Sequence, residues 1–301
     1  MMAKRSVLAI TLLASCGGRA PLQPLPDGGP PDVARFAAIG DYGSGSADEG
    51  AVADLIRNWG ADYIVTLGDN NYPSGEAATI DDNIGRFYAD YIGGYHGRFG
   101  PGSPVNRFWP CIGNHDRYSM PPLQPYLDYF HALPNNGRYY DVVIGDVQLF
   151  ALDSNDPRDP ALEPDGFTMD SVQGRWLQSR LALSKACHKI VFFHHPPYSS
   201  GTFGVSQMQW PFKAWGADVV MTGHEHFYER LDVDGIPYIT QGLGGDDKFG
   251  FNDTPDARSR VRYNQDFGAL LITADKHGIH YEFRTVSGVT VDTLTVPKSC
   301  L

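Results

Sequence analysis

A short apolar run that ends in glycine and a polar residue recurs along this 301-residue chain. Four such runs close in "IGDYG", "LGDNNY", "IGNHD" and "TGHEH", and a fifth, "KIVFFHH", ends directly in two histidines. Helical patterns stand between them: "ADEGAVADLIRNWG", which should end on Gly60, "SVQGRWLQSRLALS" and "MQWPFKAWG" (208–216). The segment "GRYYDVVIGDVQLFALDS" is predicted to form a hairpin that turns at Ile144–Asp146. Strands that alternate with helices predict βαβ units and a largely parallel sheet, and the hairpin-rich last third adds antiparallel strands.

The polar residues after these runs are expected to share one place in the fold. In parallel sheets, the positions just beyond the carboxyl ends of neighbouring strands converge on one edge. The residues so placed are far apart in the sequence and predicted to be neighbours in space: Asp41, Asp69, Tyr72, Asn114, His115, His194, His195, His224 and His226.

The residue types at these positions predict a metal site. Each motif alone is weak, since an aspartate after such a strand usually begins a turn or caps the next helix. "GHEH" is more specific, because histidines at i and i+2 of an extended chain face the same way and can bind one metal ion or two adjacent ions. All five motifs together, each at a strand end, indicate metal binding.

In their order, these motifs resemble the signature of the calcineurin-like metallophosphoesterases, and specifically of the purple acid phosphatases: GDxG, GDxxY, GNH(D/E), VxxH and GHxH. The matching segments are "GDYG" (40–43), "GDNNY" (68–72), "GNHD" (113–116), "VFFH" (191–194) and "GHEH" (223–226). The resemblance extends from about Ala34 to the C-terminus, so a single catalytic domain over residues 33–301 is expected, without the extra N-terminal β domain of the plant enzymes. It implies an α/β (α+β) fold, a two-sheet β-sandwich flanked by helices.

The resemblance also implies two metal ions that share one carboxylate. The first ion, Fe(III), would be bound by Asp41, Tyr72 and His226. The second, a divalent Fe, Zn or Mn ion, would be bound by Asn114, His194 and His224, and Asp69 would bridge the two.

The chemistry of the ligands agrees with this division. A phenolate is a hard, anionic ligand suited to trivalent iron, whereas an amide oxygen and imidazoles suit a borderline divalent ion. A free phenol has a pKa near 10, so only a strongly acidic metal ion would deprotonate Tyr72 at neutral pH. The simpler interpretation is that Tyr72 packs at the base of a loop.

The activity implied by the resemblance is hydrolysis of phosphate monoesters. A metal-bound hydroxide would attack phosphorus, and His115, just outside the metal ligands, would protonate the leaving group. Asp116 either orients the His115 imidazole or caps a helix. Hydrolysis of diesters or nucleotides on the same metal pair, and a non-catalytic metal-binding protein of the cell surface, remain as alternatives.

The chain departs from the family pattern in one loop. Family members commonly carry a further histidine after the VxxH strand, directed at the substrate, and Phe203 stands at that position here. His195 either substitutes for it or packs inside the protein, since it should face away from His194 on an extended strand. Arg230 in "FYER" is expected to be a structural partner beneath the site.

The net charge of −11 argues against binding to nucleic acid or to an anionic membrane through a basic face. A small phosphorylated substrate is the expected partner, because Fe(III) with a divalent ion and three anionic ligands leaves a local charge of about +2. The sequence does not indicate an oligomeric state.

The N-terminus resembles a targeting segment. "MMAKR" is a basic start, and "SVLAITLLAS" is an apolar run too short to span a bilayer. It ends in "LASC", which is similar to the lipobox of bacterial lipoproteins, with Cys16 as the lipidated residue. The alternatives are an ordinary cleaved signal peptide and a cysteine that stands there by chance. Residues 1–16 would then be a signal peptide, residues 17–32 a Pro/Gly-rich tether, and the protein periplasmic or on the cell surface.

Export would place the remaining cysteines in an oxidising compartment. Cys111 lies inside an apolar run and is expected to be a buried free thiol. A disulfide between Cys187 and Cys300 would fix the C-terminal tail, although both cysteines could also stay reduced.

Overall fold

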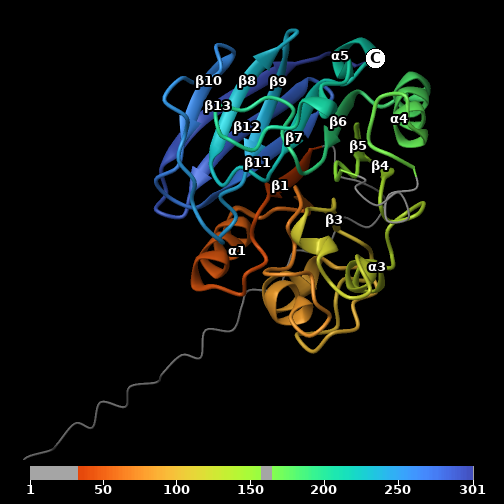
Figure 1. Ribbon diagram of the computed structural model, residues 1–301, viewed down its shortest axis with the longest axis vertical. Helices are drawn as coiled ribbons and strands as arrows, with labels where there is room; N and C mark the ends of the chain where they lie inside the picture. Colours follow the sequence, from red (N-terminus) through yellow and green to blue (C-terminus); the bar gives the residue numbers. More distant parts are fainter. Residues whose placement is uncertain (1–32, 157–164, 301) are drawn as a thin grey trace, which may run out of the picture.

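The computed structural model describes residues 33–156 and 165–300, which form two β-sheets packed face to face with helices around them (Figure 1). The first sheet has six strands in the order β13 (Thr290–Pro297), β12 (Gly278–Thr285), β11 (Gly268–Asp275), β1 (Ala34–Ile39), β2 (Tyr63–Thr66) and β3 (Phe108–Pro110). The second has seven in the order β10 (Ser259–Tyr263), β8 (Tyr228–Val233), β9 (Ile236–Gln241), β7 (Val219–Thr222), β6 (His188–Phe192), β5 (Val147–Ala151) and β4 (Tyr140–Ile144). The predicted sandwich is confirmed. The predicted signal peptide and tether lie outside the described residues.

The α-helices of the described chain are α1 (Ala47–Trp59), α2 (Arg86–Tyr88), α3 (Gln124–Tyr129), α4 (Val172–Leu183) and α5 (Phe212–Trp215). A π-helical turn at Asp81–Gly85 and 3₁₀ turns at Ala89–Tyr91, His115–Arg117 and Ser206–Met208 complete them. None of these helices is long and apolar enough to cross a bilayer.

The parallel strands expected from the alternating pattern are divided between the two sheets. β1, β2 and β3 run parallel in the first, and β5, β6 and β7 run parallel in the second. The C-terminal hairpins add the antiparallel strands, and β11 pairs with β1 so that Ala274 lies opposite Ala34. Two sets of parallel carboxyl ends therefore contribute to one site.

Helix α1 shows how the sequence produces its local structure. The Ser46 side chain accepts a hydrogen bond from the backbone of Glu49 and caps the start of the helix. Val52 and Ile56 are fully buried on one face, and α1 packs against β11. The predicted end at Gly60 is confirmed, with a left-handed backbone (φ 78°) that glycine adopts without steric cost.

The second sheet is buried on both faces. Ile190 and Val219 pack in the cluster that also contains strands of the first sheet. Their sequence neighbours Val191 and Val220 pack in a second cluster with residues of α4 and α5. Because strand side chains alternate between faces, β6 and β7 need continuous apolar sequence, which is what made them recognisable.

Three further predictions can be compared with the structure. The hairpin that turns at Ile144–Asp146 is confirmed by the pairing of β4 with β5. The disulfide between Cys187 and Cys300 is present, and Cys111 is a buried free cysteine. The helix expected over residues 208–216 is reduced to the single turn of α5, because Pro211 has no amide hydrogen and disfavours a helical residue before it.

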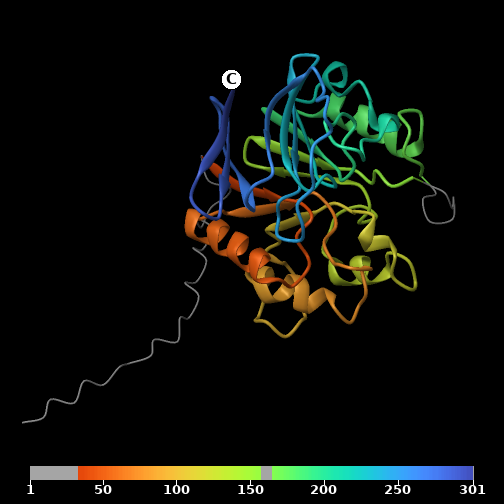
Figure 2. The ribbon, with the colours of Figure 1, turned by 60° about the vertical axis from the view of Figure 1, so that its left-hand side comes forward.

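The connections between β2 and β4, orange to yellow in Figures 1 and 2, gather on one side of the two sheets. They lie beyond the carboxyl ends of β1, β2 and β3, where the predicted site residues are found. An Asp81 carboxylate holds this region together by accepting hydrogen bonds from the hydroxyls of Tyr95 and Tyr129 and from the backbone of Arg98.

Candidate metal centre and active site

The structure brings the seven predicted metal ligands together from both sheets. Each lies just after the carboxyl end of a strand, as the sequence predicted. From the first sheet come Asp41 after β1, Asp69 and Tyr72 after β2, and Asn114 after β3; from the second come His194 after β6 and His224 and His226 after β7.

One group of donor atoms surrounds the Tyr72 hydroxyl. This oxygen lies 3.3 Å from Oδ1 of Asp41, 3.2 Å from Oδ2 of Asp69 and 3.2 Å from Nε2 of His226. Nε2 of His226 is itself 3.3 Å from Oδ1 of Asp41. The ring of His226 is held by stacking on Phe249, with ring centroids 4.0 Å apart. This group contains two carboxylates, a phenol and an imidazole.

A second group surrounds Nε2 of His194. This nitrogen lies 3.2 Å from Oδ2 of Asp69, 3.1 Å from Oδ1 of Asn114 and 3.1 Å from Nδ1 of His224. Oδ2 of Asp69 therefore belongs to both groups. The division into two groups with one shared carboxylate is the one implied by the family resemblance.

Three of these ligands have an unusual backbone. Asp41, Asp69 and His224 have φ angles of 56°, 51° and 68°, in the left-handed region that residues with a side chain rarely adopt. The amide of His224 donates to Oδ2 of Asp41 at 2.8 Å, and the amide of His115 donates to Oδ1 of Asp69 at 2.8 Å. Such strain is typical of functional sites, where the surrounding structure maintains it.

Two of the strand-end motifs begin with a glycine, Gly68 or Gly113, because there is no room for a side chain at these positions. A β-carbon on Gly68 would lie 2.5 Å from Nδ1 of His194, and one on Gly113 would collide with the backbone nitrogen of Asp69. These glycines let the ligand-bearing segments approach each other closely.

The donor set fits two metal ions. Nδ1 of His194 donates to the carbonyl of Leu67 at 2.7 Å, so in the neutral ring the lone pair of Nε2 is directed at the other donors. Two overlapping sets of donor atoms, one from Asp41, Asp69 and His194 and one from His194, His195 and His224, each lie within 4.8 Å of one another.

The electrostatics of the site also favour bound cations. Burial alone would raise the pKa of Asp69, but the adjacent His194 outweighs burial and holds that pKa below its usual range. Burial lowers the pKa of His194, but Asp69 outweighs this and raises it to about 9. Burial, assisted by Asp69 and Asp41, raises the pKa of Tyr72 well above 10. Ionising this phenol therefore requires a strongly acidic metal ion.

His115 lies beside the ligands and not among them. Its Nδ1 donates to the carbonyl of Pro73 at 2.6 Å, which leaves Nε2 as the nitrogen able to exchange a proton with a substrate. The ring is partly exposed and packs on the ring of Tyr72, with centroids 4.5 Å apart. This placement is compatible with a proton donor at the mouth of the site.

Asp116 does not orient the His115 imidazole, and that prediction is wrong. Its buried carboxylate accepts hydrogen bonds from the backbone of Gly113 and from the backbone and side chain of Asn70. Residues 115–117 form a 3₁₀ turn, in which successive side chains point in different directions. Asp116 thus joins the loops after β2 and β3 beneath the metal ligands, and the carbonyl of Pro73 holds the imidazole instead.

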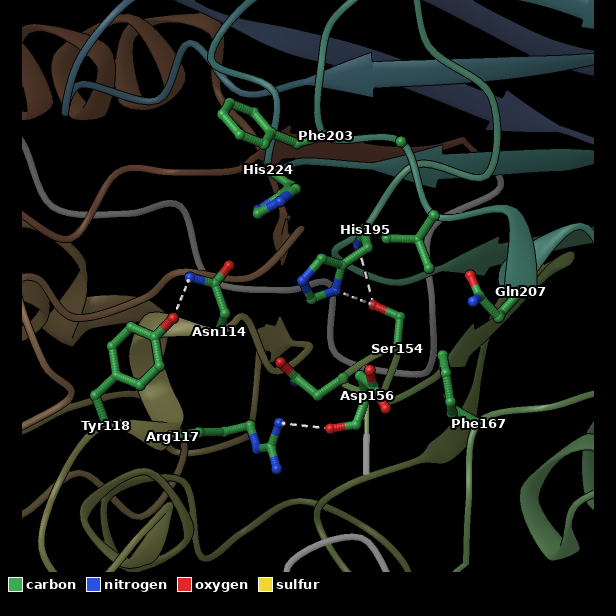
Figure 3. Close-up of a pocket in the computed structure, with 13 residues that line it drawn as sticks. Asn114, Arg117, Tyr118, Ser154, Asp156, Phe167, His195, Phe203, Gln207 and His224 are labelled. Carbon is green, nitrogen blue, oxygen red and sulfur yellow. Dashed lines mark hydrogen bonds between the residues drawn. The ribbon is translucent and has the colours of Figure 1, made fainter. Parts of the chain in front are cut away.

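His195 and Phe203 both line a pocket of about 560 Å³ next to the metal ligands (Figure 3). The Phe203 side chain is 49% exposed, and its ring centroid is 5.8 Å from that of His224, so it lies at the rim and is not buried under its loop. His195 is only 9% exposed, and its ring centroid is 4.4 Å from that of His224. Arg230 is paired with Asp292 and is a structural residue, as expected.

Two residues near the site were missed by the sequence reasoning. The Tyr118 hydroxyl accepts a hydrogen bond from Nδ2 of Asn114 at 3.3 Å, which turns the amide oxygen towards His194 (Figure 3). Ser154 follows β5 and contacts His195. Ser154 could have been found, because β5 is the parallel neighbour of β6 and its carboxyl end belongs to the same edge. Tyr118 comes from a loop, and no pattern pointed to it.

Comparison with known proteins agrees with this site. Residues 34–228, more than half of the chain, match the calcineurin-like phosphoesterase family. The chain is 25% identical over 272 residues to tartrate-resistant acid phosphatase type 5 of Rattus norvegicus, covering 79% of this chain and 77% of that protein. It is 26% identical over 235 residues to purple acid phosphatase 17 of Arabidopsis thaliana, covering 69% and 68%.

Solved structures with the same fold include two that cover most of the chain. The purple acid phosphatase PPD1 from yellow lupin superposes with a TM-score of 0.69 at 19% identity, over 89% of this chain and 54% of that one. GAP50, described as the anchor in the inner membrane complex of Plasmodium, superposes with a TM-score of 0.68 at 20% identity, over 89% and 90%. The chain thus belongs to the calcineurin-like phosphoesterase family, as a hydrolase of phosphoric esters related to the purple and tartrate-resistant acid phosphatases.

Proposed function

We propose that this protein is an acid phosphatase that cleaves phosphate monoesters at a dinuclear metal centre. The observation that carries the proposal is the division of the donor atoms into two groups that share Oδ2 of Asp69. Tyr72 belongs to one group only, which suits Fe(III), and the imidazole and amide donors of the other suit divalent Fe, Zn or Mn. When bound, the two ions would supply positive charge for the phosphate and lower the pKa of a coordinated water.

The protein's own residues would bind the ester and move a proton. His115, when protonated, donates from Nε2 to the oxygen of the departing alcohol, while the Nδ1 contact with Pro73 keeps the ring in place. The buried carboxylates of Asp41 and Asp69 would bind the two metal ions and offset part of their positive charge. The adjacent pocket of about 560 Å³ accommodates the rest of the substrate.

A non-catalytic role is the second candidate, since the similar fold of GAP50 belongs to a protein described as an anchor. The donor set favours the enzyme, as does Nε2 of His115, which has no hydrogen-bond partner among residues 33–156 and 165–300. Activity on diesters or nucleotides is a variant of the same chemistry and depends on the loops that surround the pocket.

A metal analysis followed by a kinetic screen tests the proposal. The purified protein should hold two metal ions per chain, one of them iron, and should hydrolyse monoesters faster than diesters at acidic pH. Asp69→Asn should abolish activity and metal binding together, whereas Asp292→Asn, which alters a buried aspartate paired with Arg230, is the control that should keep both. A protein that holds two metal ions but hydrolyses no phosphoester would refute the enzymatic proposal.

A further inference from the structure

His195 is a buried histidine at the metal centre that is not one of the seven ligands. Its ring lies against two of them, with centroids 4.9 Å from His194 and 4.4 Å from His224. It also lines the pocket that lies beside the centre. A polar ring in this position needs hydrogen-bond partners, because an unsatisfied buried polar group is costly.

Ser154 satisfies one side of the His195 ring. The Ser154 hydroxyl oxygen accepts a hydrogen bond from the backbone amide of His195 at 3.0 Å and lies 2.9 Å from Nδ1 of the same residue. Within residues 33–156 and 165–300, no other residue hydrogen-bonds to this hydroxyl. When this hydroxyl donates its hydrogen to Nδ1, the neutral imidazole carries its own proton on Nε2.

Nε2 of His195 has no hydrogen-bond partner among the described residues. Figure 3 shows the ring between Ser154 on one side and Asn114 and His224 on the other, so Nε2 is directed towards the metal ligands that line the pocket. A protonated nitrogen cannot bind a metal ion, but it can donate a hydrogen bond to an anion placed there. Phe203 at the rim offers no donor.

We propose that His195 and Ser154 form an oxyanion subsite, in which Nε2–H of His195 donates to a non-bridging oxygen of the bound phosphoryl group and Ser154 positions the ring. The subsite rests on the proposed function, because the phosphoryl group must lie at the metal centre. It takes phosphate and tetrahedral oxyanions of similar shape. His195 is the residue that touches the ligand, and Ser154 acts through His195.

The affinity of the metal-loaded protein for inorganic phosphate tests this proposal without relying on turnover. His195→Ala should keep both metal ions and weaken phosphate binding, measured by titration calorimetry, by about 10- to 100-fold, the value of a hydrogen bond to a charged group. His195→Gln, which retains an N–H donor of similar length, should recover part of the loss. Ser154→Ala should weaken binding less, because the ring then divides between two tautomers.

Two further measurements separate the subsite from other roles of His195. Nitrogen NMR of the metal-free protein should show a His195 ring protonated at Nε2. In Ser154→Ala, the same spectrum should show a mixture of the Nδ1–H and Nε2–H tautomers. The matched control is the exposed pair of His280 and Thr295, also a histidine Nδ1 bonded to a hydroxyl, at 3.0 Å. His280→Ala should leave phosphate affinity unchanged.

The possible results have distinct meanings. Loss of one metal ion in His195→Ala, with thermal stability preserved, would show that His195 is a ligand and would overturn the proposal. Unchanged phosphate affinity in a folded, fully metallated His195→Ala protein would overturn it as well. If the wild type binds phosphate through His195 but hydrolyses no ester, the subsite stands and the proposed function fails.

Discussion

Replacing His115 by alanine should slow the hydrolysis of alkyl phosphates far more than that of nitrophenyl phosphates. An alkoxide is a poor leaving group and needs the proton that Nε2 of His115 is placed to give, whereas nitrophenolate leaves without one. The backbone amide of residue 115, which donates to Asp69, is unaffected by the change. Metal binding should therefore survive.

The size of the effect follows from what the alanine removes. Loss of a general acid costs about 10²–10⁴ in rate, or about 3–5.5 kcal/mol in the barrier. Loss of the Nδ1 contact with Pro73 costs only about 0.5–1.5 kcal/mol in stability, because the ring is partly exposed and water can replace it. The change should therefore appear in kcat for alkyl esters and hardly in the melting temperature.

The assay compares kcat for a series of esters whose leaving groups differ in basicity, with metal content and thermal melts measured on the same samples. In the wild type, kcat should depend weakly on leaving-group pKa, and in His115→Ala the dependence should become steep. His131→Ala changes an exposed histidine that the site does not use and serves as the control. Equal losses on alkyl and nitrophenyl esters would show that His115 positions the substrate and is not the acid.

Tyr72→Phe should remove the visible absorption expected of a phenolate bound to Fe(III) while the protein still folds; an active, iron-replete protein without colour would remove the reason for assigning iron to this site. Phe203→His adds a donor at the rim, so kcat/KM on small alkyl phosphates should rise and any preference for aryl esters should fall; a gain on neither class would contradict a role in substrate contact. We also propose export with a lipid anchor, so Cys16→Ser should move the protein from the membrane fraction to the soluble fraction. A wild-type protein that is already soluble and whose mature chain begins at a residue other than Cys16 would contradict the lipid anchor. Burial raises the pKa of Asp81, but its three hydrogen bonds outweigh burial and lower it below 3.8. The stability that this group contributes is present above about pH 4 and is lost as the pH falls through the folded-state pKa, so Asp81→Asn should flatten the acid side of a plot of melting temperature against pH.

The metal ligands could be predicted because their positions follow from strand geometry. Asp41, Asp69 and His194 each follow an apolar run long enough to be recognised as a buried strand, and parallel strands bring their carboxyl ends together. The division of the strands between two sheets does not follow from the alternating pattern. It came from the family resemblance, because apolar runs are similar whichever sheet contains them.

Contacts made by loops were harder to predict. Asp116 adjoins His115 in sequence, but a 3₁₀ turn sends the two side chains in different directions, and adjacency alone suggested the wrong partner. Tyr118 reaches Asn114 through the same turn. His195 was expected to face away from the ligand His194, but the strand ends at Phe192, so alternation no longer applies there.

The place of β1 in the first sheet has a consequence for biosynthesis. β1 leads directly to Asp41 and lies between β2, which follows it closely, and β11, which comes from the last quarter of the chain. As the chain leaves the ribosome, the backbone groups on one edge of β1 have no strand to pair with until β11 has been synthesised. Such long-range pairing makes folding slow and late. A protein that completes its first sheet only at the end would still be unfolded when its synthesis ends, which is compatible with the proposed export as an unfolded chain.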